Sequence, residues 1–258
     1  MILYAMLAIL LCAGVISAIA PKSASGQPIH WVGFNGQSVI LIFVVYVAAY
    51  TFLGGAFAIS LLAALALHET GHVLAHHMLG RGASHLRLAP VLSDVAVQSQ
   101  PFRDEGQAFF VALMGAGFSL GPLVLAVGLG MAMQEISPDL SAFLLLFSAT
   151  VAGVNCLLLL PFRGLDGGRC AEISARNFWP ALVPGMSAFM IAAFAVSGLR
   201  RMSIAMLLLA GYGVLSLFAR PVAALKPMGP DAGLTALAAY VLTFAAHFSG
   251  AILLVTYL

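Results

Sequence analysis

The sequence predicts an all-α polytopic membrane protein with six to eight transmembrane helices in one integral membrane domain, residues 1–258. Two observations lead to this prediction. Hydrophobic residues make up 62% of the chain and charged residues only 8%, whereas soluble domains carry about 45–50% and about 25%. The apolar residues also fall in runs of spanning length. With so few charges the chain could not cover the surface of a soluble globule, so most of its exterior must face lipid.

Charge and cysteine content exclude two further classes of protein. The net charge of +2 is small and the basic residues are scattered, which gives no electrostatic footprint for a nucleic acid. The three cysteines are an odd number inside or beside apolar runs. They therefore indicate no disulfide framework.

Eight apolar runs are candidates for membrane helices, because about 20 mostly apolar residues cross a bilayer. They are residues 2–20, 38–52, 56–79, 107–133, 140–160, 181–199, 203–219 and 234–258. Residues 38–79 as one helix would be about 63 Å long, so Gly54-Gly55 is read as a break. A single bent or re-entrant element is the alternative. The first run could instead be a signal peptide, because Ala18-Ile19-Ala20 has the form of a cleavage site.

The loops between these runs predict the orientation. Residues 80–106 and residues 161–180 carry three arginines each, and residues 134–139 carry none. The positive-inside rule therefore places the first two loops in the cytoplasm, although Arg200-Arg201 falls on the other side of this scheme. Short alternating patterns within residues 80–106 favour a β-hairpin at the membrane face.

One apolar run contains ionisable residues that a lipid-facing helix would not need. His68, Glu69 and His72 lie together within residues 56–79, where charged groups are costly and mark functional sites. Residues i and i+4 project from the same helix face, so the two histidines can bind one metal ion and Glu69 can reach a water on it. The spacing HExxH is therefore typical of zinc hydrolases.

A catalytic zinc site usually has a third protein ligand, and two residues are candidates. His76 is four residues beyond His72, but its side chain is rotated by about 40° from that of His72. The extended HExxHxxGxxH pattern also fails, because Met78 occupies its last position. Asp166 is favoured, because residues 56–79 and 140–160 are both predicted to end at the cytoplasmic face. Zn²⁺ with the carboxylates of Glu69 and Asp166 is also formally neutral, which lowers the cost of burial.

These residues resemble the site-2 protease family of intramembrane zinc metalloproteases. The resemblance covers about residues 56–169, the three-helix catalytic core of that family, and includes Met114-Gly115-Ala116-Gly117 in the middle helix. It implies one Zn²⁺ per chain and a catalytic glutamate, and it implies that an asparagine contacts the substrate or the developing oxyanion. The implied metal ligands are His68, His72 and Asp166, the implied general base is Glu69, and the implied asparagine is Asn155.

The chain departs from the family pattern in its spacing. Asn155 lies 11 residues before Asp166 with one proline between them, whereas the family commonly has two prolines in a tighter arrangement. No stretch is long or polar enough for an appended PDZ or CBS domain.

The expected function is therefore hydrolysis of peptide bonds in or near transmembrane segments of a membrane protein or peptide substrate. The active site is expected toward the cytoplasmic face, and a strand-like edge in residues 80–106 is expected to accept the unwound substrate by β-addition. A transporter or metal-binding scaffold is the alternative from another class, and a pseudoprotease that binds membrane segments without cutting them is a third. His85 and His247 are read as structural or interfacial.

Overall fold

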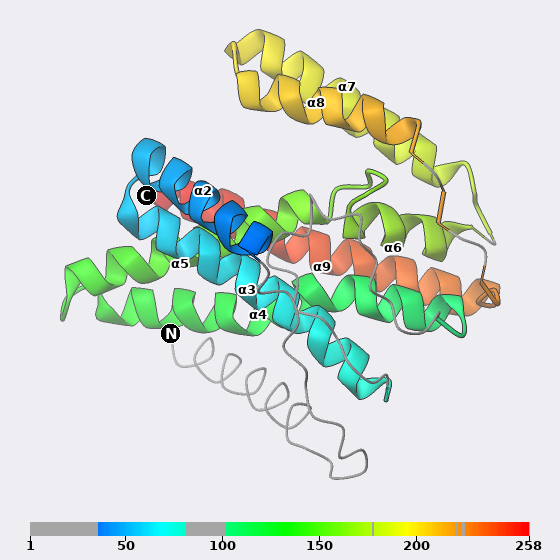
Figure 1. Ribbon diagram of the computed structural model, residues 1–258, viewed down its shortest axis with the longest axis horizontal. Coiled ribbons are helices and arrows are strands. Elements are labelled where there is room, and N and C mark those ends of the chain that lie inside the picture. The colour runs from blue at the N-terminus through cyan, green and yellow to red at the C-terminus, as the bar shows by residue number, and fades with distance from the viewer. Residues whose placement is uncertain (1–35, 81–101, 177, 220, 223–224, 258) are drawn as a thin grey trace. The chain divides into compact units, whose positions relative to one another are not determined.

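The computed structural model describes residues 36–80, 102–176, 178–219, 221–222 and 225–257, and these residues are almost entirely helical (Figure 1). The helices are α2 (Gly36–Leu53), α3 (Gly55–Met78), α4 (Glu105–Met133), α5 (Pro138–Leu158), α6 (Asp166–Ala175), α7 (Leu182–Arg201), α8 (Ile204–Leu217) and α9 (Pro230–Tyr257). Within the described ranges the β-structure is limited to an isolated bridge between Asp104 and Lys226. The expected hairpin falls mostly in residues 81–101, outside the described residues.

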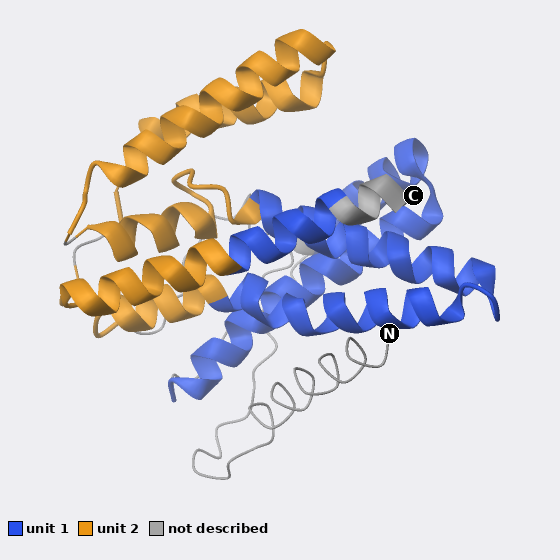
Figure 2. Ribbon diagram, turned by 180° about the vertical axis from the view of Figure 1, so that it is seen from behind, with its two compact units in different colours: residues 1–101, 114–157, 243–258 blue, residues 102–113, 158–242 orange. Residues whose placement is uncertain are grey.

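The described chain forms two compact units (Figure 2). The first unit contains α2, α3, nearly all of α5, residues 114–133 of α4 and residues 243–257 of α9. The second unit contains residues 102–113 and 158–242, which include α6, α7 and α8.

The first unit shows the predicted break between two helices. Gly54 has a φ of +89°, a conformation that residues with a Cβ rarely adopt. It separates α2 from α3, which then pack against each other.

Alanine and glycine bring the helices of the first unit together around a core that also contains leucine and valine. Ala64 of α3, Leu123 of α4 and Ala152 of α5 belong to one buried apolar cluster, and Ala251 of α9 packs against it. Gly71 of α3 is buried, and a Cβ at this position would collide with the backbone of α4 at Met114. These residues let four helices approach closely, as small residues do in membrane bundles.

The second unit contains a hairpin of two apolar helices. Met202 ends α7 in the left-handed conformation, with φ 51°, and the Ser203 hydroxyl then accepts a hydrogen bond from the Met206 N–H at the start of α8. The two helices pack closely, because a Cβ at Gly198 would lie 2.8 Å from the Leu207 side chain. This turn is the predicted boundary between residues 181–199 and 203–219.

The second unit also corrects one expectation. Residues 161–180 were expected to be a loop, but Asp166–Ala175 is helix α6. Gly167 and Gly168 are weak helix formers, so the sequence favours a turn there. The helix forms because its first turn packs directly on neighbouring backbone: a Cβ at Gly167 would collide with Leu159, and one at Gly168 with Phe162.

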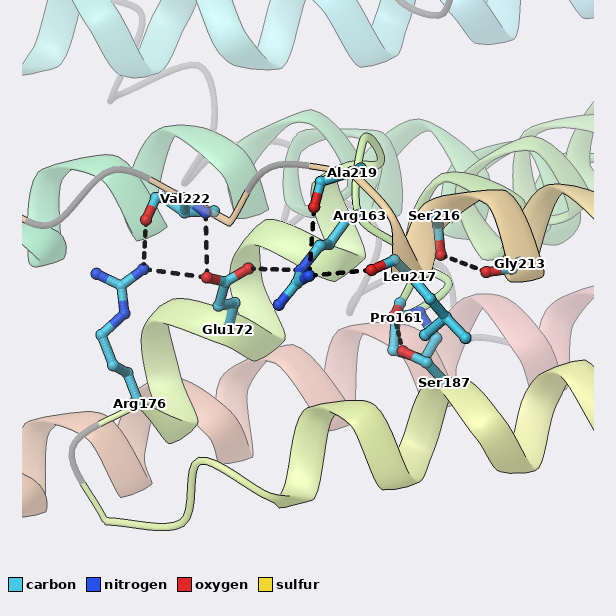
Figure 3. A network of polar contacts seen from close by, with 10 residues as sticks. All are labelled: Pro161, Arg163, Glu172, Arg176, Ser187, Gly213, Ser216, Leu217, Ala219 and Val222. Atoms are coloured by element: carbon cyan, nitrogen blue, oxygen red, sulfur yellow. Dashed lines mark hydrogen bonds and ion pairs between the residues drawn. The ribbon is translucent and has the colours of Figure 1, made fainter.

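A network of charged groups fixes the rest of α6 (Figure 3). Arg176 donates hydrogen bonds to the Glu172 carboxylate at 3.3 Å and to the Val222 carbonyl at 2.8 Å, and the Val222 N–H donates to Glu172 at 3.1 Å. Arg163 pairs with the other oxygen of Glu172 at 3.4 Å. Arg176 also binds Glu105, which is 1% exposed, at 3.0 Å. The network ties the segment after α8 to α6 and to the beginning of α4.

Five of the described helices are long and apolar enough to cross a membrane, namely α3, α4, α5, α7 and α9. The apolar part of α2, Val39–Leu53, and helix α8 are shorter. At 1.5 Å per residue the 14 residues of α8 span about 21 Å, less than the roughly 30 Å of a hydrocarbon core. These lengths indicate an integral membrane protein, and residues 2–20 of the predicted set lie outside the described residues.

Candidate metal centre

His68 and His72 meet on one face of α3, as their spacing predicts. Their Nε2 atoms are 3.0 Å apart, and their rings are nearly perpendicular, at 83°. Two imidazoles bound to one tetrahedral Zn²⁺ at about 2.05 Å have nitrogens about 3.3 Å apart. The pair is therefore within a few tenths of an ångström of the spacing that a shared metal ion requires.

Asn155 of α5 fixes which nitrogen of His68 faces His72. The Asn155 Nδ2 group donates to the Val151 carbonyl at 2.9 Å, and a carbonyl can only accept. The Asn155 Oδ1 atom therefore faces His68, and the His68 Nδ1–H donates to it at 2.8 Å. In the neutral ring, this leaves the lone pair on Nε2, the atom beside His72. Metal-binding histidines are commonly oriented by such a bond from the other ring nitrogen.

Helix α4 lines the histidine pair through a glycine. A Cβ at Gly115 would lie 2.6 Å from Cε1 of His68 and 2.7 Å from Nε2 of both histidines. Those distances are shorter than van der Waals contact, so the space beside the two nitrogens exists because residue 115 has no side chain. The sequence placed Gly115 in the middle core helix but gave no sign of this contact.

Asp166 completes a group that could hold a metal ion. The ligand atoms of His68, His72 and Asp166 all lie within 4.8 Å of one another. His68 is buried, and the other two residues are partly buried. Two imidazole nitrogens and one carboxylate oxygen form a donor set that suits Zn²⁺ and leaves a position for water. His76, the alternative third ligand, is one turn further along α3 and does not belong to this group.

Glu69 is a buried residue of the same helix as the two histidines. It follows His68 directly in α3 and is 4% exposed. Asn155 is completely buried. Its described hydrogen bonds join it to His68 and Val151, so the structure assigns it a contact with a candidate ligand, and its expected contact with substrate stays a prediction.

His247, which the sequence predicts to be structural or interfacial, lies beside the part of α4 that lines the histidine pair. It lies in α9, is completely buried, and its Nε2 atom is 3.0 Å from the Ala116 carbonyl oxygen, next to Gly115. The available signal was an ionisable residue inside an apolar run. Without knowledge of which helix α9 contacts, that signal could not be connected with the HExxH motif.

Comparisons with known proteins add no relative: no protein-family model, curated protein or solved structure matches the chain.

Proposed function

We propose that the chain is a zinc-dependent intramembrane endopeptidase that resembles the site-2 proteases. The observation that supports this most directly is the distance of 3.0 Å between the Nε2 atoms of His68 and His72. Both residues belong to a helix that is long and apolar enough to span a membrane. The hydrogen bond that His68 Nδ1–H donates to Asn155 keeps the His68 Nε2 lone pair available for a metal ion. Asp166 is the proposed third ligand.

Each residue of the proposed site has a chemical task. Bound zinc would lower the pKa of a coordinated water toward about 7 and polarise the carbonyl of the scissile bond. Glu69 would take the proton from the attacking water and pass it to the leaving amine, as a general base and then a general acid. Asn155 would keep His68 in the tautomer that can bind metal.

The position of the motif supports a substrate within the membrane. Helix α3 is a candidate membrane span, and His68 and Glu69 are buried in its C-terminal half. A substrate helix would have to unwind locally, because its backbone amides are already hydrogen-bonded. We propose that water and substrate reach the site from the cytoplasmic face, as the distribution of arginines predicts.

The experiment compares Glu69→Gln with the wild-type protein, both purified and loaded with zinc. A single-span membrane protein serves as substrate, and Glu135→Gln is the matched control, because Glu135 is exposed in the turn after α4. We expect Glu69→Gln to keep its zinc and to lose cleavage by about 10²–10⁴-fold, the usual contribution of general base catalysis. The control should cleave like the wild type.

Two results would decide against parts of this proposal. Equal cleavage by Glu69→Gln and the wild type would contradict the role of Glu69. If the wild-type protein binds zinc but cleaves no single-span substrate, a metal-binding scaffold or pseudoprotease would be favoured. The third ligand is tested separately by the zinc affinity of Asp166→Ala, with the exposed Asp139→Ala as its control.

A further inference from the structure

His247 has one ring nitrogen that is satisfied and one that is not. Its Nε2 atom is 3.0 Å from the Ala116 carbonyl oxygen of α4. Its Nδ1 atom is buried and has no hydrogen-bond partner among the residues that the structure describes. A buried polar atom without a partner costs free energy, so such atoms often mark the place of a ligand or a bound water.

The hydrogen bond between Nε2 and the Ala116 carbonyl determines which nitrogen of His247 carries the proton. A carbonyl oxygen only accepts hydrogen bonds, so the proton of the neutral imidazole is on Nε2. The Nδ1 atom then carries a lone pair and can only accept. What it would bind is therefore an N–H or O–H donor.

The contacts of the first unit place the His247 ring at the level of the two histidines of the candidate metal centre. Gly115 faces the nitrogens of His68 and His72, and the next residue, Ala116, binds His247. One turn further along α9, a Cβ at Gly250 would contact Ala152 at 3.4 Å. Ala152 lies on α5 three residues before Asn155, which binds His68.

Four helices of the first unit thus each contribute a group at the same level of the bundle, and these groups are called the His68 layer. The groups are His68 from α3, the turn Gly115–Ala116 from α4, Asn155 from α5 and His247 from α9. His68, Asn155 and His247 are all completely buried. In this layer His247 Nδ1 is the acceptor that the described protein does not use.

We propose that His247 is a further binding residue of this site, and that its Nδ1 atom accepts a hydrogen bond from an N–H or O–H donor. The donor is a backbone amide of the bound substrate chain or a water that accompanies it. This inference rests on the proposed function. A substrate segment that has been unwound for cleavage exposes backbone N–H groups, and each needs an acceptor in a site that excludes bulk water.

Two substitutions separate this role from a purely structural one. Glutamine carries its amide nitrogen at about the position of the His247 Nε2 atom, so His247→Gln can keep the bond to Ala116 and loses the Nδ1 acceptor. Asparagine carries its amide oxygen at about the position of Nδ1, so His247→Asn keeps the acceptor and loses the bond to Ala116.

We expect His247→Gln to bind zinc like the wild type and to lose roughly 5- to 100-fold in kcat/KM, the effect of one unmade hydrogen bond. His247→Asn should retain most of the activity, even if its thermal midpoint falls. The reverse order, with His247→Gln active and His247→Asn inactive, would show that His247 only holds α4 in place and would overturn the proposal.

A spectroscopic measurement keeps this inference independent of cleavage. The ¹⁵N resonance of an imidazole acceptor nitrogen moves upfield when it accepts a hydrogen bond, and His247→Gln identifies which resonance belongs to His247. We expect this upfield shift for His247 Nδ1 in zinc-loaded Glu69→Gln protein. This variant is used because it should bind a single-span peptide without cleaving it. A shift that is present without peptide identifies water as the donor, and one that develops only with peptide identifies the amide. An unshifted resonance in both samples would overturn the inference, whatever the outcome of the cleavage assay.

Discussion

Gly115 offers the sharpest test of the metal centre, because a single methyl group is predicted to disturb it. In Gly115→Ala the new Cβ would lie 2.6 Å from Cε1 of His68 and 2.7 Å from Nε2 of His68 and of His72. Ordinary van der Waals contact begins at 3.4 Å. Both ligand nitrogens must therefore move by about 0.7 Å, or α4 must move away from α3.

A shift of that size exceeds what zinc coordination tolerates. Ligand distances in zinc sites agree within about 0.2 Å, and substitutions that merely misorient ligands cost roughly 10- to 100-fold in metal affinity. We expect Gly115→Ala to weaken zinc binding by at least that factor. The measurement is a competition titration of the purified protein against a zinc-binding dye.

Gly117→Ala is the matched control. It is in the same helix, and the nearest atom to its new Cβ would be the Met114 sulfur at 3.9 Å. Replacing glycine by alanine in a helix stabilises it by up to about 1 kcal/mol where space allows, so Gly117→Ala should keep the zinc affinity and should not lower the thermal midpoint. Wild-type zinc affinity in folded Gly115→Ala would refute the placement of the histidine pair against α4.

Two further predictions concern the second unit. Arg176→Met should lower the thermal midpoint by on the order of 5–10 °C, because it takes away a charged partner of the buried Glu105 and of Glu172, a loss worth about 3 kcal/mol. The control is Arg200→Met, which changes an exposed arginine and should leave the midpoint unchanged. An unchanged midpoint in Arg176→Met would contradict the importance of the network. Burial, aided by the Asp166 carboxylate, raises the pKa of the Cys170 thiol well above its usual value. The thiol is therefore protonated at about pH 8.5, and in a variant with no other cysteine it should react with iodoacetamide only after unfolding; fast reaction of the folded protein would show that Cys170 is accessible.

Local spacing explains what could be predicted from the sequence. The membrane helices follow from long apolar runs, and the meeting of His68 and His72 follows from the helical repeat, since residues i and i+4 share a face in any α-helix. Neither inference needs knowledge of which helices are neighbours. The boundary at Gly54 is similar, because a backbone with φ +89° is a property of one residue.

Contacts between distant segments explain what could not be predicted. Helix α6 begins at Asp166 and contains Gly167-Gly168, a pair that opposes a helix until its fit against Leu159 and Phe162 is known. His247 is 131 residues from its partner Ala116. No local pattern records such a pairing.

The network around Glu105 also limits how early this part of the protein can fold during its synthesis. Glu105 precedes Arg176 by 71 residues and Met228, whose N–H also binds its carboxylate, by 123 residues. At roughly 5–20 residues per second a ribosome needs about 6–25 s to make the longer stretch. Until Arg176 has been made, the start of α4 has to remain in contact with water, because a buried carboxylate without counter-charge is costly. Final closure of this part of the protein therefore waits until the start of α9 has been synthesised, well after the HExxH helix.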